Sequence, residues 1–107
     1  MIFITAKFPV KPEYADEWPL LSQEFTEATR GEEGCLWFEW SRSLDDPTVY
    51  VLVEAFRDGD AGGAHVRSEH FATATSLLPA YLTRTPDIVS VTVDGTGWSE
   101  LGEMAVH

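Results

Sequence analysis

The segment Val49–Phe56, with the sequence VYVLVEAF, is apolar at nearly every position, and Glu54 is its only charged residue. Successive side chains of an extended strand point to opposite faces of a sheet, so this strand has no polar face. An antiparallel sheet with one solvated face normally carries polar residues on that face. The chain must therefore fold so that both faces of this strand are covered.

Three further strand segments and two helical regions complete the expected fold. The strand segments are Ile2–Phe8, Cys35–Ser43 and Asp87–Val93, which are rich in apolar residues and bounded by turn-forming residues. Apolar residues recur at helical spacing over residues 14–28 and again over residues 71–82. The resulting order, β-α-β-β-α-β, predicts an α+β ferredoxin-like fold with a four-stranded antiparallel sheet and both helices on one face.

Proline and glycine refine the expected helix boundaries. Pro19 lies inside the first helical region, so the helix should kink there or begin there with Pro19 in its first turn. The glycine-rich segment Asp58–Ala64 is expected to be a loop that leads into the second helical region. Pro79 marks the last turn of that region or a break in it.

The chain is expected to form one domain, residues 1–94, followed by a C-terminal tail, residues 95–107. The opening segment resembles a strand rather than a signal peptide, and no apolar run approaches the roughly 20 residues of a membrane span. Cys35 is the only cysteine, so an internal disulfide is impossible and a reducing compartment is the natural setting. A cytoplasmic location is therefore expected.

Seven basic and 18 acidic residues give the chain a formal net charge of −11 at neutral pH. Such a surface repels phosphate backbones and anionic lipid headgroups, and no run of lysine or arginine offsets it. Nucleic acid and membrane surfaces are therefore not expected as partners. Strongly anionic small substrates are disfavoured for the same reason.

The apolar character of the strands also bears on assembly. Two helices can cover only one face of a sheet, which would leave an unusually large apolar area on the other face in water. The same sheet from a second copy would cover it and would give a two-fold homodimer. The alternative is that the tail, residues 95–107, folds back over this face.

A family resemblance covers nearly the whole chain, from the first strand to about Val93. The central stretch, EATRGEEGCLWFEWSRSLDDPTVYVLVEAFRDGDAGGAHVRSEHF, resembles the signature of the antibiotic biosynthesis monooxygenase domain family. The matching features are the acidic-Gly-Cys at the helix end, the Asp-Pro hairpin, the strand glutamate and the His-x-x-Ser-x-His-Phe segment. The resemblance implies a homodimeric α+β barrel of two ferredoxin-like subunits, with a small pocket between helices and sheet in each.

The resemblance also implies several reactions. Some members oxidise phenols, hydroquinones or anthrones to quinones with molecular oxygen, without metal, flavin or haem. Others degrade haem, and some isomerise small signalling molecules. Haem-degrading members share a Trp-x-x-Ser-x-x-Phe-x-x-x-His pattern, but His65 and Thr75 replace its tryptophan and its iron-ligating histidine here. The chain also has no asparagine, which those members and the anthrone-oxidising members use, so either a different residue set acts here or another reaction is catalysed.

Two histidines are the candidate catalytic residues. A cofactor-free oxygenase must take a proton from a hydroxyl-bearing aromatic ring, and imidazole can accept a proton near neutral pH. His65 is the preferred base because it lies where the loop enters the helical region, and Ser68 would share its side of a helix. His70 is the second candidate. On one continuous helix these histidines would lie about 140° apart, so they are not expected to act as a pair.

Further residues are expected to bind the substrate. The aromatic walls of a dry pocket are expected from Phe38, Trp40, Phe56, Phe71 and Tyr81, with Ser68 nearby. Glu54 would be costly to bury unpaired. It either orients a histidine or arginine or belongs to a structural ion pair, with Arg42 or Arg84 as the partner. Cys35 has no cationic neighbour in the sequence and is interpreted as a packing residue.

No metal site is expected, because His65 and Glu69 would supply at most two ligands and there is no Cys-x-x-Cys or His-x-x-x-His. The favoured function is a cofactor-independent monooxygenase that oxidises a small phenol, hydroquinone or anthrone to a quinone, with molecular oxygen as co-substrate. The alternatives are a small-molecule isomerase and a non-catalytic dimeric ligand-binding module on the same fold. The sequence does not identify the substrate.

Overall fold

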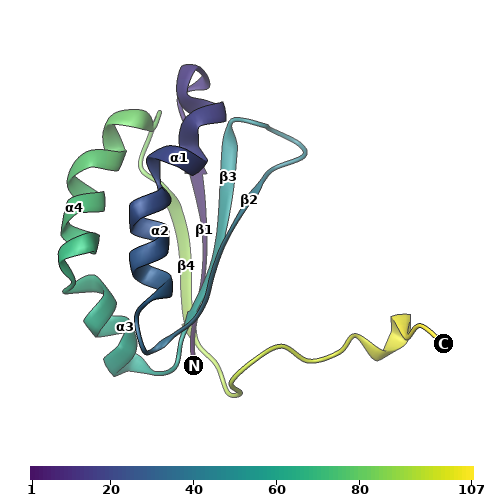
Figure 1. Ribbon diagram of the computed structural model, residues 1–107. Helices are drawn as coiled ribbons and strands as arrows, with labels where there is room; N and C mark the ends of the chain where they lie inside the picture. The colour runs from purple at the N-terminus through teal and green to yellow at the C-terminus, as the bar shows by residue number, and fades with distance from the viewer.

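Four antiparallel strands form one sheet in the order β2-β3-β1-β4. The computed structural model describes all of residues 1–107 and is shown in Figure 1. The strands are β1 (Ile2–Pro9), β2 (Cys35–Arg42), β3 (Val49–Phe56) and β4 (Asp87–Thr92). All four strands lie within two residues of the predicted positions, and the ferredoxin-like α+β fold is confirmed.

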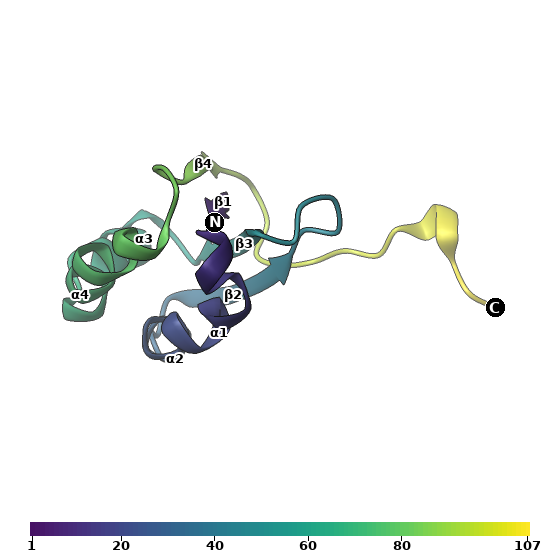
Figure 2. The same ribbon diagram turned by 90° about the horizontal axis from the view of Figure 1, so that it is seen from above.

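The helices lie together on one face of this sheet, as Figures 1 and 2 show. The larger ones are α1 (Trp18–Leu21), α2 (Gln23–Arg30), α3 (Gly59–Val66) and α4 (Glu69–Leu77). Three 3₁₀ turns join or follow them: η1 (Pro12–Glu17), η2 (Leu78–Tyr81) and η3 (Gly102–Met104). None of the helices has the length and hydropathy that a membrane crossing requires.

The first helical region is divided rather than continuous. Pro19 occupies the first turn of α1, where a proline costs no backbone hydrogen bond, as one of the two expected arrangements requires. The Ser22 hydroxyl then donates to the carbonyl of Trp18 at 2.8 Å, at the junction between α1 and α2. The two short helices together place Trp18 and Phe25 toward the sheet.

The segment Asp58–Ala64 is mostly helical, so the predicted loop there is wrong. Asp58 has an extended backbone, and its carboxylate accepts from the Ala61 amide at 2.9 Å, which caps the first turn of α3. Close packing also favours small residues here. A Cβ on Gly34 would lie 2.2 Å from the Cβ of Ala61, so only glycine lets α3 approach the start of β2 this closely. Tertiary contact outweighs the low helix propensity of the glycines.

The core lies between the helices and the inner face of the sheet. One cluster joins Val10, Trp18, Tyr50 and Leu82, and a second joins Ala6, Phe38 and Leu52. The Tyr50 hydroxyl is buried and donates to the Ala15 carbonyl at 2.8 Å, which ties η1 to the sheet.

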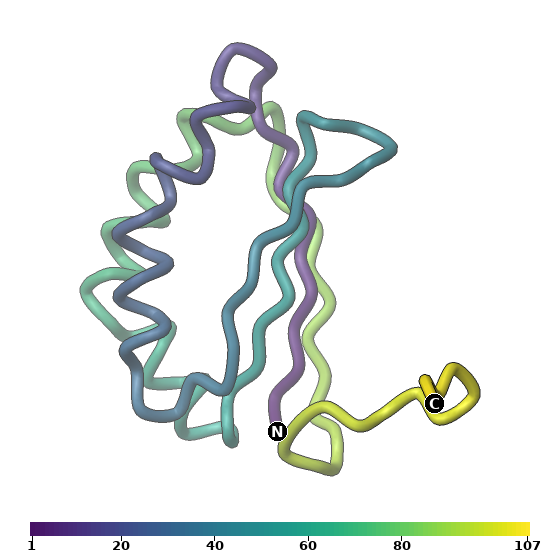
Figure 3. Tube along the Cα trace, turned by 45° about the vertical axis from the view of Figure 1, so that its right-hand side comes forward, coloured from purple at the N-terminus to yellow at the C-terminus, as the bar shows by residue number.

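The opposite face of the sheet is apolar and open. Side chains that alternate with the core positions point to it, among them Phe3, Trp37, Val89 and Val91, and the last two are 58% and 43% exposed. We call this surface the outer face. The tail runs away from the sheet in Figure 3. Trp98 of the tail contacts this surface, with its ring 5.1 Å from that of Trp37. Val89 and Val91 stay exposed, so in this structure the tail leaves the β4 side of the outer face uncovered.

Candidate active site

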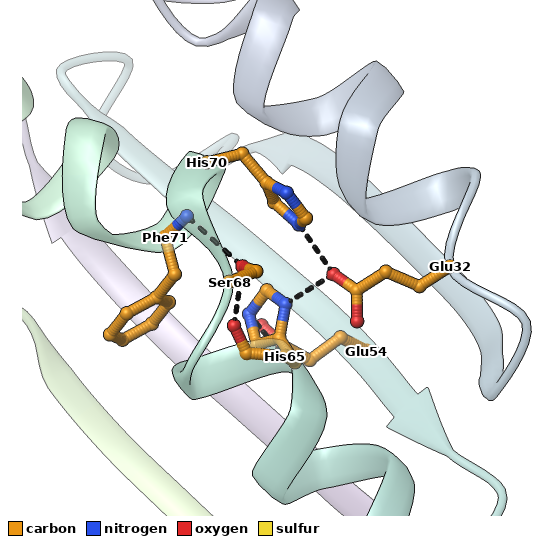
Figure 4. A network of polar contacts seen from close by, with 6 residues as sticks. All are labelled: Glu32, Glu54, His65, Ser68, His70 and Phe71. Atoms are coloured by element: carbon orange, nitrogen blue, oxygen red, sulfur yellow. Dashed lines mark hydrogen bonds and ion pairs between the residues drawn. The ribbon is translucent and has the colours of Figure 1, made fainter.

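One carboxylate joins the two histidines of the His-x-x-Ser-x-His segment. Oε2 of Glu32 lies 2.7 Å from Nδ1 of His65 and 2.6 Å from Nε2 of His70 (Figure 4). Both distances are those of short hydrogen bonds. Where the carboxylate accepts from both rings, each of these ring nitrogens carries the N–H. We call Glu32, His65 and His70 the His–Glu–His cluster.

A break between α3 and α4 brings the two histidines together. Ser68 is extended (φ −74°, ψ 156°), and its hydroxyl accepts from the Phe71 amide at 3.2 Å and donates to the His65 carbonyl at 2.6 Å. His65 therefore sits in the last turn of one helix and His70 in the first turn of the next. The prediction that they cannot act as a pair is wrong, because it assumed one continuous helix.

Glu32 is the member of the His–Glu–His cluster that sequence reasoning missed. It lies in the turn between α2 and β2, and it is 33 residues from His65 and 38 from His70. Its neighbour Glu33 is of the same type and points to solvent. The only signal in the sequence is an acidic pair between two glycines, which does not show which carboxylate turns inward.

His65 is buried among aromatic rings rather than open to a cavity. Its ring stacks on Phe56 with centroids 4.8 Å apart, and Phe71 lies edge-on at 5.2 Å. Phe38 is at 6.4 Å. The predicted site residues Phe38, Phe56, Ser68 and Phe71 therefore all surround this histidine, and they restrict the access of water to it.

Glu54 lies beneath His65 on β3. Its Oε1 is 4.0 Å from Nε2 of His65, and burial, followed by the negative charge of Glu32, raises the pKa of its carboxyl to about 7. It has no ion pair with the two arginines considered in the sequence. Arg42 pairs with Asp16 and Arg84 pairs with Asp87. Its nearest cationic or titratable partner is therefore His65 rather than an arginine.

A groove of about 420 Å³ between α2 and α4 adjoins the cluster. We call it the α2–α4 groove. His70 lines it, whereas His65 does not. Its apolar wall includes Leu21, Phe25, Leu77 and Tyr81, and the only charged residues in its lining are two glutamates, Glu24 and Glu69. The groove therefore suits an apolar molecule without negative charge, and His70 is the member of the cluster that such a molecule could reach.

Two predicted site residues lie apart from the histidines. Trp40 packs against Trp18 at 5.7 Å in the core, and its indole N–H donates to Thr26. Tyr81 lines the groove and packs edge-on against Tyr14 at 4.8 Å. Burial, followed by the charges of Glu32 and Glu54, raises the pKa of the Cys35 thiol to about 11, which is consistent with a packing role.

Comparisons with known proteins agree on one family. The sequence profile of the antibiotic biosynthesis monooxygenase family matches residues 1–76. The chain is 25% identical over 87 residues to the uncharacterised protein sll1783 of Synechocystis sp., which covers 81% of this chain and 59% of that protein. It is 29% identical over 86 residues to YcnE of Bacillus subtilis, covering 77% of this chain and 90% of YcnE.

Solved structures show the same similarity. A conserved protein from Methanosarcina mazei Go1 superimposes with a TM-score of 0.79 and 31% identity, covering 84% of this chain and 89% of that one. A crystal structure described as an antibiotic biosynthesis monooxygenase has a TM-score of 0.79 and 28% identity, with 89% and 100% coverage. The similarity therefore extends over most of the fold, including the strands and helices that carry the His–Glu–His cluster.

Proposed function

Because this chain belongs to the antibiotic biosynthesis monooxygenase family, we propose that it oxidises a small phenol, hydroquinone or anthrone to a quinone with molecular oxygen and no cofactor. Family membership supports a monooxygenase-like reaction in general. The observation that carries the finer proposal is His70, which lines the α2–α4 groove and is held by Glu32 at 2.6 Å.

His70 is the proton acceptor in this proposal. Its Nε2–H donates to Glu32, so in the neutral ring Nδ1 carries the free lone pair. A substrate hydroxyl in the groove can give its proton to that atom. His65 and Glu32 act as positioning residues, because their mutual hydrogen bond at 2.7 Å holds the carboxylate that orients the His70 ring. This assignment moves the base from His65, the preferred candidate from sequence, to His70.

The oxidation then follows from the charge on the substrate. Loss of the proton gives an electron-rich anion that can transfer one electron to oxygen, and the two radicals combine to form a C–O bond. Loss of water from the resulting peroxide leaves a carbonyl. For a phenol or an anthrone, one oxygen atom enters the quinone and the other leaves as water, so a ring C–H or CH₂ is oxidised without any outside reductant. A hydroquinone already carries both oxygens, so it gives two electrons and two protons to oxygen and the second product is hydrogen peroxide. The apolar walls of the groove keep the radical pair away from bulk water.

The experiment is oxygen uptake in metal-free buffer with a panel of dihydroxynaphthalenes and anthrones. We expect uptake and quinone formation with at least one neutral member, and slower reaction of its carboxylated analogue because of Glu24 and Glu69. A product that forms equally well without oxygen would identify an isomerase instead. Ligands that stabilise the protein against heat and are never converted would identify a binding module.

We also propose that the protein acts as a homodimer whose subunits meet at the outer face. Val91 is 43% exposed there, next to Phe3 on β1, and an apolar surface of this extent is rarely left in water. We expect the wild-type protein to sediment as a dimer at micromolar concentration and Val91→Glu to sediment as a monomer. Leu20→Glu is the control, because Leu20 is 73% exposed on α1, which lies on the opposite, helix-covered side of the sheet. A monomeric wild type, or a dimeric Val91→Glu, would contradict the proposal.

A further inference from the structure

We propose that the His–Glu–His cluster is also a binding site for one divalent first-row transition metal ion, with Zn²⁺ as the representative. Three potential ligand atoms, one each from Glu32, His65 and His70, lie within 4.8 Å of one another. They come from three separate segments: the α2–β2 turn, the end of α3 and the start of α4. Sequence spacing suggested at most two ligands, because it could not place Glu32 beside the histidines.

The donor set indicates which ions fit. Two imidazole nitrogens and one carboxylate oxygen are a common ligand set for Zn²⁺ when a fourth position stays open. Imidazole also suits other ions of the first transition row, whereas Mg²⁺ and Ca²⁺ prefer oxygen ligands throughout. The site is therefore expected to bind Zn²⁺ or Co²⁺ and to discriminate against Mg²⁺ and Ca²⁺.

A local rearrangement of the three side chains would admit the ion. Ligand atoms around a tetrahedral Zn²⁺ lie roughly 3.3 Å apart, given metal–ligand distances near 2.0–2.2 Å. The two nitrogens are 2.7 and 2.6 Å from Glu32 Oε2 here and within 4.8 Å of each other, so both must move away from that oxygen and toward one another. The His70 side chain can move most easily, because it borders the groove and is a quarter exposed.

Glu54 supplies a second, independent observation. A metal-bound histidine usually donates its other ring N–H to a carboxylate, which fixes the ring and raises the basicity of the ligand. If Nδ1 of His65 binds the ion, its proton must reside on Nε2, and that atom faces Glu54 Oε1 at 4.0 Å. Glu54 is therefore placed to accept from this N–H once the proton lies on Nε2 and the two side chains move closer than 4.0 Å.

The charges around the cluster favour a cation. Neither Glu32 nor Glu54 forms an ion pair with a lysine or arginine, although both are largely buried. Oε1 of Glu32 is buried and has no hydrogen-bond partner. Buried carboxylates are costly unless they are compensated. A divalent ion would compensate both of them and could use the free oxygen of Glu32.

A bound metal ion would prevent His70 from accepting a proton from the substrate. This consequence rests on the proposed function. With Nε2 of His70 on the metal, the proton of the neutral ring lies on Nδ1. Nδ1 then has no lone pair for a substrate hydroxyl. The ion and the reaction therefore compete for the same ring, and metal binding is expected to inhibit.

Binding is tested without any substrate, by titrating the chelator-treated full-length protein with Co²⁺. We expect one equivalent per chain, with the intense visible absorption of a four- or five-coordinate site, displaced by Zn²⁺ and unaffected by millimolar Mg²⁺. Glu32→Gln and His70→Ala should weaken binding at least 100-fold, and Glu54→Gln about 10-fold or more. His107→Ala is the control, because it removes an exposed histidine at the C-terminus and should bind as the wild type does.

Circular dichroism without metal shows whether each variant is folded. If His70→Ala does not fold, His70→Gln is used in its place. Absence of the absorption band at a tenfold excess of Co²⁺ would overturn the proposal. So would unchanged affinity in folded Glu32→Gln and His70 variants. Oxygen uptake with a substrate that the wild type converts should fall in proportion to Zn²⁺ occupancy, and uptake that rises with Zn²⁺ would overturn the inhibitory role. The binding result stands whether or not a substrate is found.

Discussion

Replacing His70 with alanine is expected to lower kcat for the oxygen-dependent reaction about 100-fold, the lower end of what general-base catalysis contributes. The substrate hydroxyl would then have no acceptor in the α2–α4 groove, and proton transfer to water would have to replace it. The KM should change little, because the apolar wall that includes Leu21 and Phe25 remains. Steady-state oxygen uptake in metal-free buffer measures both constants.

The matched control is His107→Ala, which removes a histidine far from the groove and should leave kcat unchanged. Glu32→Gln separates positioning from catalysis. An amide can still accept a hydrogen bond from His70, but it cannot stabilise the imidazolium that forms, so kcat should fall while KM stays constant. A folded His70→Ala variant that retains kcat within threefold of the wild type would remove this residue from the mechanism.

Replacing Trp18 with alanine is expected to lower the free energy of unfolding by about 3–5 kcal/mol, the range for truncating a buried aromatic residue. The indole is fully buried. It packs against Phe8 at 5.8 Å, Trp40 at 5.7 Å and Tyr50 at 6.4 Å, so its loss leaves a cavity that these rings cannot fill. For a domain of this size the loss is a large part of the total stability.

Urea unfolding at one fixed protein concentration measures this effect, because any dimer makes the apparent stability depend on concentration. Leu20→Ala is the control on the same short helix. Leu20 is 73% exposed, and its replacement should change the free energy of unfolding by less than about 0.5 kcal/mol. Equal losses from the two substitutions would contradict the conclusion that packing of the indole sets the stability of this region.

Local sequence patterns predicted the strands better than the helices. A strand such as Val49–Phe56 is recognisable because its apolar run and its flanking turns lie within a few residues. The helical regions contained interruptions, and the spacing of apolar residues over a whole region does not show where a helix is interrupted. Ser22 lies at the junction between α1 and α2, and Ser68 precedes the second predicted region and separates α4 from α3; each hydroxyl bonds to the backbone. The helix at Gly59–Val66 was missed because its stability comes from the Asp58 cap and from contact with Gly34.

The candidate site was predicted in its residues but not in its arrangement. Both histidines and the rings of Phe38, Phe56 and Phe71 were identified, because their types suit proton transfer and a dry pocket. Their roles could not be assigned, because burial separates His65 from the groove that His70 lines. Trp40 packs against Trp18 and Phe38 in the core, because an inward-pointing strand aromatic can pack there as well as beside a site.

The sequence by itself determined that this chain forms an α+β sheet with helices on one side. The two signals for this, the order of the elements and the apolar strands, are local patterns that recur along the chain. Only the tertiary structure decided that Glu32 joins His65 and His70. Residues more than 30 positions apart meet because the α2–β2 turn packs beside the break between two helices, and no periodicity within one segment records such a contact.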